Sequence, residues 1–193
     1  MRILFLFLIM LLPAPAVSQD NPTSYIRANV DKVVNILTSP EYEAETNKTE
    51  QLRQIEAVVD NFFDAEELSK RSLGQYWRIF TPEQKQEFQP LFLKLIKQVY
   101  LKKSITYNGE VVNYNQEIIK SDTLAEVHTT VTSPDLNIPI IYYMIRKDVS
   151  WKVYDVSVEN VSLIKNYRSQ FRSILQNNSP DKLIATLRDK TNE

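Results

Sequence analysis

The sequence contains no cysteine, one histidine and two glycines among its 193 residues. The lack of cysteine excludes disulfides, thiolate metal sites and a cysteine nucleophile. A single imidazole, at His128, excludes any metal site or motif that needs two of them. With only Gly74 and Gly109, the chain cannot form a Gly-rich phosphate loop or a dinucleotide fingerprint. We therefore expect no metal site and no nucleotide cofactor.

An excess of charge of one sign is also lacking. The 23 Lys and Arg residues against 24 Asp and Glu residues give a formal net charge of −1. No basic field is present to hold nucleic acid or an anionic membrane surface, so we expect no nucleic-acid partner. The hydrophobic content of 43% and the charged content of 24% are ordinary for a globular protein, and the length suggests one domain.

One long apolar run is present, and it lies at the N-terminus. Residues Ile3 to Leu12 are apolar, follow the positive Arg2 and end at Pro13. The small residues Ala16-Val17-Ser18 then fit a small-x-small cleavage pattern. The run is too short to span a bilayer, which needs about 20 apolar residues. The pattern predicts a signal peptide over residues 1–18, export of the protein, and a single folded domain over residues 19–193.

Hydrophobic periodicity predicts helices, then strands, then helices. The expected helices are residues 22–39, a helix capped by Thr49, a short helix from Asp64 to Gly74, and a long helix from Thr81 to about residue 103 that contains Pro90. Four strands follow at residues 111–119, 123–132, 138–147 and 151–159, with short links that favour an antiparallel meander. Helices at residues 161–177 and after Ser179-Pro180 end the chain. The pattern is typical of an α+β fold with helices packed on a mainly antiparallel sheet.

The catalytic inventory is thin. Tyr154 and Asp155 could form an acid/base pair, but neighbours on a strand point to opposite faces, which favours a core tyrosine and an aspartate at the rim. His128 alternates with apolar residues and is better explained as a half-exposed strand residue than as a base. We therefore expect no catalytic residues and no enzymatic activity.

The stretch from Trp151 to Phe171, WKVYDVSVENVSLIKNYRSQF, resembles the signature of the MlaC family, also called toluene-tolerance auxiliary proteins. The segment from Phe63 to Arg78 is similar to the family's D-F…LG-x-x-W-R pattern. Thr81-Pro82-Glu83-Gln84 is similar to the start of the family's next helix. The similarity covers about residues 25–187, and one departure is Asn160, which stands where relatives usually have glycine.

The resemblance implies a non-enzymatic, monomeric carrier that holds a diacyl phospholipid as cargo in an apolar cavity between sheet and helices. It implies a periplasmic location in a Gram-negative bacterium. The implied partners are an outer-membrane lipoprotein/porin complex and an inner-membrane ABC transporter with an MCE-domain subunit. The implied role is to shuttle lipid between these complexes and so to maintain the lipid asymmetry of the outer membrane.

The inward faces of the expected elements supply candidate lipid-binding residues. On the last strand the inward row begins at Val153 or Tyr154, and we choose Tyr154. For every candidate, packing in the core is the competing interpretation, because cores and pockets use the same residue types. The candidates are Leu95, Val99, Tyr100, Ile140, Tyr142, Met144, Tyr154, Val156, Val158, Val161, Ile164, Tyr167 and Phe171.

Three alternatives remain open on the sequence. A carrier of the same fold could take a hopanoid or another isoprenoid lipid. An enzyme on a cone-shaped α+β fold would need a convergent polar set around Asp155. A pure adaptor for the transporter would have a filled interior with no cavity.

Overall fold

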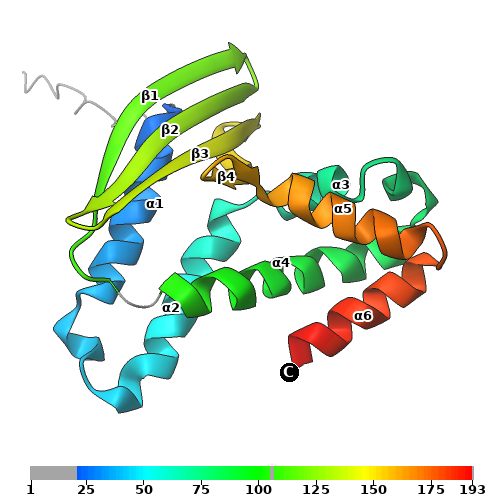
Figure 1. Cartoon of the computed structure of the whole chain (residues 1–193), viewed down its shortest axis with the longest axis horizontal. Helices are drawn as coiled ribbons and strands as arrows, with labels where there is room; N and C mark the ends of the chain where they lie inside the picture. Colours follow the sequence, from blue (N-terminus) through cyan, green and yellow to red (C-terminus); the bar gives the residue numbers. More distant parts are fainter. Residues whose placement is uncertain (1–20, 105–106, 193) are drawn as a thin grey trace, which may run out of the picture.

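In chain order, four α-helices come first, one antiparallel sheet follows, and two α-helices end the described residues. Figure 1 shows the sheet at the top and the helices packed below it. The computed structural model describes residues 21–104 and 107–192, so the expected signal peptide lies outside the described residues. The helices are α1 (Pro22–Leu37), α2 (Lys48–Phe62), α3 (Ala65–Leu73), α4 (Pro82–Ser104), α5 (Leu163–Leu175) and α6 (Pro180–Asn192). Short 3-10 helices occupy Pro40–Tyr42, Glu45–Asn47 and Gly74–Ile79. The strands are β1 (Val111–Ser121), β2 (Leu124–Ser133), β3 (Leu136–Lys147), β4 (Ser150–Val158) and β5 (Val161–Ser162). This arrangement confirms the α+β class.

The sheet is a meander in the order β1-β2-β3-β4-β5, so it has five strands and the expectation of four was wrong. The missed strand, β5, has two residues, and Val161 pairs with Val158 and Ser162 with Ser157. We expected helix from Val161. Instead α5 begins at Leu163, because the Ser162 hydroxyl accepts a hydrogen bond from the Lys165 N–H and caps the helix.

A β-bulge in β4 decides which of its residues face inward. Met144 of β3 pairs with Val153, while the preceding Tyr143 pairs with Asp155, so Tyr154 has no partner in the register. The extra residue shifts the alternation by one position. As a result Val153 shares the inner face of the sheet with Val156, and Tyr154 does not.

Side-chain caps begin α3 and α4 where the sequence indicates, but the expected cap at Thr49 was wrong, because α2 begins at Lys48 after Asn47 and has no side-chain cap. Asp64 accepts a hydrogen bond from the Glu67 N–H at 2.9 Å, and α3 ends at Gly74, whose φ is 57°. Thr81 and Gln84 exchange hydrogen bonds of 3.0 and 3.2 Å as a capping box at the start of α4. The helix α4 continues through Pro90 without interruption.

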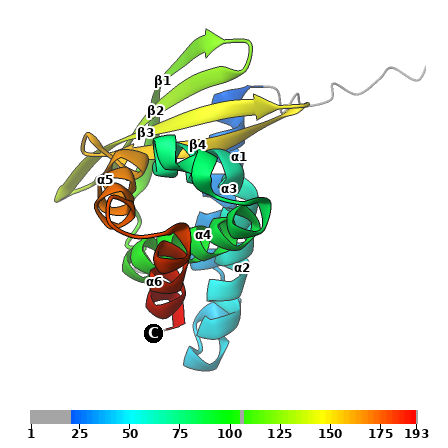
Figure 2. The same ribbon diagram turned by 90° about the vertical axis from the view of Figure 1, so that its right-hand side faces the viewer.

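Two buried clusters lie on either side of β4. One joins α3, α4, α5 and α6, with Phe88, Phe92 and Phe171 at its centre. The other lies between the inner face of the sheet and α1, and it includes Ile26 and Met144. Figure 2 shows α3 to α6 grouped below the sheet, with α1 and α2 running behind them. The two clusters therefore leave a space where α2, α4 and the β4–β5 turn approach one another.

The link between α2 and α3 is fixed to the sheet. Phe63 ends α2 in an extended conformation and forms a parallel bridge with Val153, and the Asp64 N–H donates to the Val153 carbonyl at 2.8 Å. Lys147 at the end of β3 forms an ion pair with the Asp64 carboxylate at 2.7 Å. These contacts hold the C-terminal end of α2 against β4. Within the described residues, no helix combines the length and the hydrophobicity needed to cross a bilayer.

Glu67 makes the stability of α3 sensitive to acid. Burial opposes its charged form, but ion pairs with Lys70 at 3.1 Å and Arg71 at 2.9 Å outweigh burial and hold the Glu67 pKa below its ordinary value of about 4.3. Because the folded-state pKa is the lower one, the stabilisation is fully present above about pH 4.3. It is lost as the pH falls through the folded-state pKa.

We expect Glu67→Gln to remove part of the acid sensitivity of the unfolding free energy, measured by urea denaturation at a series of pH values. The exposed Glu43, changed to Gln, serves as the control and should leave the pH profile as it is in the native sequence. Parallel profiles for native protein and Glu67→Gln would contradict the prediction.

The turn between β4 and β5 places two non-glycine residues in the left-handed region. Glu159 has a φ of 49° and Asn160 a φ of 66°. Asparagine tolerates this conformation, whereas glutamate has a cost of about 1–2 kcal/mol. Glu159→Asn should therefore raise the free energy of unfolding by about 0.5–1 kcal/mol, as measured by chemical denaturation, because Asn favours a two-residue hairpin turn of this type. An equal gain from Glu159→Ala would show that charge, and not backbone conformation, is responsible.

Candidate functional site

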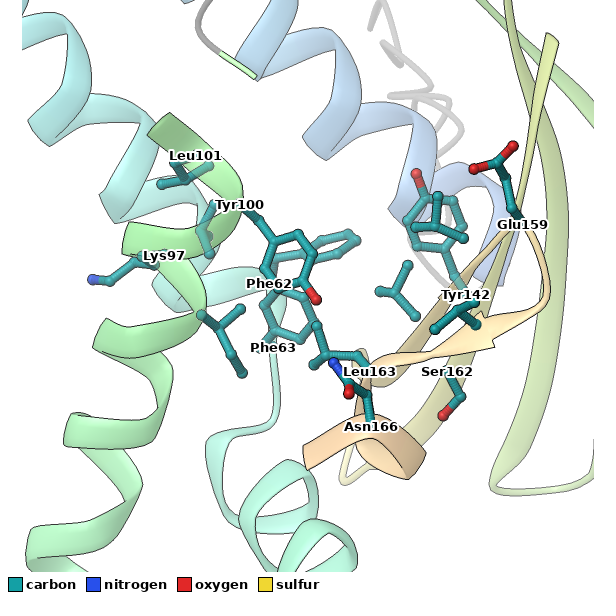
Figure 3. A pocket seen from close by; sticks show the side chains of 15 residues that line it. Phe62, Phe63, Lys97, Tyr100, Leu101, Tyr142, Glu159, Ser162, Leu163 and Asn166 are labelled. Carbon is teal, nitrogen blue, oxygen red and sulfur yellow. The ribbon is translucent and has the colours of Figure 1, made fainter. Parts of the chain in front are cut away.

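An apolar cavity of about 500 Å³ lies between α2, α4, the inner face of the sheet and the start of α5 (Figure 3). Its volume falls in the range of about 300–1,000 Å³ that is typical of sites for small ligands. The lining residues are Val59, Phe62, Phe63, Ile96, Lys97, Tyr100, Leu101, Tyr142, Val156, Val158, Glu159, Val161, Ser162, Leu163 and Asn166.

Three features of the fold bring these side chains together. The bulge in β4 directs Val156 and Val158 inward, beside Tyr142 and Ile140 on β3. The fixed end of α2 holds Phe62 and Phe63 opposite the last turns of α4, as Figure 3 shows. The cavity is thus bounded by one sheet face and two helices that the buried clusters hold in place.

The mouth of the cavity lies between the end of α4 and the β4–β5 turn. Val161 is 63% exposed and Tyr100 is 39% exposed, although both line the cavity. Glu159 is exposed in the turn, whereas the exposed Asn166 lies at another edge of the lining, in the first turn of α5 (Figure 3). In Figure 3 the Glu159 carboxylate points away from the interior.

Polar groups deeper in the lining have partners outside the cavity or are neutral. The Lys97 ammonium points away from the cavity (Figure 3) and forms an ion pair with Asp60 at 2.7 Å. The Ser162 hydroxyl donates to Asp155 at 2.6 Å. Burial raises the pKa of the Tyr142 hydroxyl to about 12, so Tyr142 is neutral at physiological pH. The interior therefore offers an apolar ligand van der Waals contacts and little competing charge.

Five of the residues expected to bind lipid line this cavity: Tyr100, Tyr142, Val156, Val158 and Val161. Ile140 lies beside them on β3, half-buried and paired with Val158, but outside the lining. Val99 is 36% exposed on α4 and also lies outside it. Lipid contact itself stays a prediction for all of them.

The remaining candidates are packed in the core. Leu95, Ile164, Tyr167 and Phe171 lie in the cluster of α3 to α6, because the apolar stripes of α4 and α5 face each other there. Met144 is fully buried in the cluster beneath the sheet. Tyr154 packs beside the helical cluster with its ring under the Arg71 guanidinium, 4.0 Å from it, because the bulge turns it away from the inner face.

Sequence reasoning missed the contribution of α2. Val59 and Phe62 lie at an apolar helical spacing, but such a spacing does not say whether that face meets a core or a cavity. Phe63 and Leu163 were missed because each lies at a helix boundary, where periodicity gives no direction. Four polar residues of the lining were missed because only apolar rows were considered: Lys97, Glu159, Ser162 and Asn166.

The residues considered for catalysis have other positions. Asp155 is buried rather than at the rim, and its carboxylate accepts hydrogen bonds from the Ser162 hydroxyl and from the Ile164 N–H at 3.0 Å. His128 is half-buried on β2, as expected, with its Nε2 atom 3.2 Å from the Glu126 carboxylate. Within residues 21–104 and 107–192, no three His, Cys, Asp or Glu side chains are grouped so that they could hold a metal.

The fold and the cavity define a class of protein: an α+β domain with an apolar interior that is open at one end. A family model described as MlaC protein matches residues 27–189, and the chain belongs to that family. This finding confirms the resemblance seen in the sequence.

Individual relatives agree with the family assignment. The chain is 24% identical over 178 residues to toluene tolerance protein ttg2D of Pseudomonas putida, covering 91% of this chain and 83% of that protein. It is 21% identical over 199 residues to the intermembrane phospholipid transport system binding protein MlaC of Haemophilus influenzae, covering 98% and 91% respectively. A phospholipid-binding protein of Ralstonia solanacearum, solved in complex with a phospholipid, has the same fold, with a TM-score of 0.77, 21% identity, and coverage of 89% of this chain and 97% of that one.

Proposed function

We propose that this chain is a phospholipid carrier that works in the periplasm. The observation that carries the proposal is the apolar cavity of about 500 Å³, with the exposed residues Tyr100, Glu159 and Val161 at its mouth. An amphiphile with apolar tails and a polar head fits such a cavity: the tails lie among the valines and aromatic rings, and the head lies at the exposed mouth. The Ralstonia protein of the same fold was solved with a phospholipid, which supports the choice of ligand.

The energetics explain why a carrier is needed. Two acyl chains of about fifteen methylenes each represent roughly 24 kcal/mol of burial, at about 0.8 kcal/mol per methylene. A phospholipid therefore does not leave a membrane for water at a useful rate, and an apolar protein interior must take the place of the bilayer. Spontaneous release from the carrier is slow for the same reason, so loading and release take place while it is docked on its partners.

The partners in this proposal are an outer-membrane lipoprotein/porin complex and an inner-membrane ABC transporter with an MCE-domain subunit. The phrase "intermembrane phospholipid transport system" in the name of the Haemophilus relative supports a transport role between membranes. Shuttling of phospholipid between the two complexes would maintain the lipid asymmetry of the outer membrane. No chemical step is part of this function.

Native mass spectrometry of the purified protein tests the proposal. We expect a population heavier than the bare chain by the mass of a diacyl phospholipid, which organic extraction removes and which incubation with phosphatidylglycerol vesicles restores. A protein that carries no lipid and takes none up from vesicles would contradict the function. If the extracted lipid were instead a hopanoid or another isoprenoid lipid, the result would support the alternative cargo.

A further inference from the structure

A second apolar space, which we call the side chamber, lies between α1 and α2. It has a volume of about 220 Å³ and adjoins the main cavity. Its walls are of two kinds. Asn29, Val30, Val33, Val34 and Val58 line the side chamber alone, whereas Val59, Phe62, Phe63 and Tyr142 line both spaces.

The side chamber is suited to hydrocarbon. Four of the residues that line it alone are valines, and the fifth, Asn29, donates its side-chain amide to the Tyr25 carbonyl at 2.8 Å within α1. The side-chain donor of Asn29 is thus already satisfied. Apolar spaces of this size take up apolar ligands in preference to water.

The Phe62 ring forms the wall between the two spaces. It lies in parallel with the Tyr25 ring at a centroid distance of 6.0 Å and meets the rings of Phe63 and Tyr142 edge-on at 5.2 and 5.9 Å. The Phe63 backbone is bound to β4 at Val153. Phe62 is the last residue of α2, it is half-buried, and its carbonyl accepts a hydrogen bond from the Tyr25 hydroxyl at 3.4 Å.

The main cavity and the side chamber adjoin each other at four shared residues, and the side chamber is partly open to solvent, because Val30, Val33 and Val34 are only half-buried. The exposed Tyr100 and Val161 mark the mouth, and Phe62 and Tyr142 lie at the boundary with the side chamber. A chain that fills the main cavity and extends past Phe62 and Tyr142 therefore enters the side chamber. The space beyond these two rings is lined by the valines of α1.

We propose that the side chamber holds the terminal part of one acyl chain of the bound lipid, and that Phe62 limits how far that chain extends. The inference rests on the proposed function and adds to it a determinant of acyl-chain length. It predicts that lipids with longer chains use contacts on α1 that lipids with shorter chains do not reach.

Photo-cross-linking tests where the chain ends. The full protein is loaded with a phosphatidylglycerol that carries a diazirine at the end of one stearoyl chain, irradiated and digested with trypsin. We expect label in residues 28–32 or 33–48, which contain Val30 and Val33 and contribute no lining residue to the main cavity. Label confined to peptides of α4, β3, β4 and α5 would overturn the inference and leave the proposed function standing. A protein that retains no lipid and no label would contradict the proposed function itself.

A variant series gives an independent measurement. Val33→Phe should fill the side chamber and weaken binding of distearoyl phosphatidylglycerol roughly tenfold, the effect of about two methylenes, while dilauroyl phosphatidylglycerol binds as before. Phe62→Leu should shift the preference toward the longer lipid. Val111→Phe, at a strand position that is 56% exposed, is the matched control for the first change. Equal losses of both lipids in Val33→Phe, with no change in Phe62→Leu, would overturn the inference.

Discussion

Val158→Trp should reduce phospholipid binding by about two orders of magnitude and leave the fold in place. Val158 projects from β4 into the main cavity, at a half-buried position paired with Ile140. An indole there occupies volume that the proposed acyl chains need. Displacing three or four methylenes costs about 3 kcal/mol, at about 0.8 kcal/mol each, which corresponds to roughly a hundredfold in affinity. The larger side chain grows into open space and not into the packed core, so overpacking should be small.

The measurement is uptake of phosphatidylglycerol from vesicles, read by native mass spectrometry at several protein concentrations. Val149→Trp is the matched control, because Val149 is 82% exposed in the turn between β3 and β4, away from the cavity. The control should take up lipid like the native sequence. If Val158→Trp also did so, at an unchanged ratio of lipid to protein, the main cavity would not be where the lipid binds.

Local chemistry explains which parts of the fold could be predicted from the sequence. The Asp64 cap, the left-handed Gly74 and the Thr81–Gln84 capping box each depend on neighbours within four residues, and all three are present. The short links between strands are also a local feature, and they predicted the antiparallel meander correctly. The two-residue strand β5 could not be predicted, because its pairing depends on the turn at Glu159 and Asn160, where neither residue is a glycine.

The candidate site was harder to predict, because it depends on contacts between distant segments. Strict alternation along β4 places Tyr154 in one row with Val156, and only the pairing with β3 reveals the bulge that replaces it by Val153. The apolar stripe of α5 is real, but Tyr167 and Phe171 meet Phe92 of α4 and form core. An apolar stripe gives the direction of burial without saying whether protein or ligand covers it, which is why cavity and core were confused.

The position of Asp155 shows the reverse case, in which a polar residue with catalytic potential has a structural role. Its carboxylate joins β4 to the first turn of α5 through the Ser162 hydroxyl at 2.6 Å and the Ile164 N–H at 3.0 Å. The Ser162 oxygen in turn accepts from the Lys165 N–H at 3.1 Å. The negative charge of Asp155 at the N-terminal end of α5 also stabilises the helix by its interaction with the helix dipole. Asp155 therefore fixes the corner at which Ser162 and Leu163 enter the cavity wall.

We expect Asp155→Ala to lower the free energy of unfolding by about 3 kcal/mol, because it leaves the Ser162 hydroxyl and the Ile164 N–H without their buried acceptor. This corresponds to a fall in Tm of about 6–12 °C for a chain of this length. Asp155→Asn should cost about half as much, since the amide oxygen can still accept one of the two hydrogen bonds. Thermal unfolding followed by circular dichroism measures both changes, and Asp135→Ala in the exposed β2–β3 turn is the control.

The asparagine variant separates a structural role from a functional one. If Asp155 acts only by holding the β4–α5 corner, Asp155→Asn should take up phospholipid like the native sequence at temperatures well below its own transition. Its loss of binding should then appear only together with unfolding. A variant that is as stable as the native protein but cannot take up lipid would contradict this and give the carboxylate a direct part at the site. Because Ser162 lines the cavity and depends on Asp155 for its position, Ser162→Ala tests the same contact from the other side and should destabilise less than Asp155→Ala.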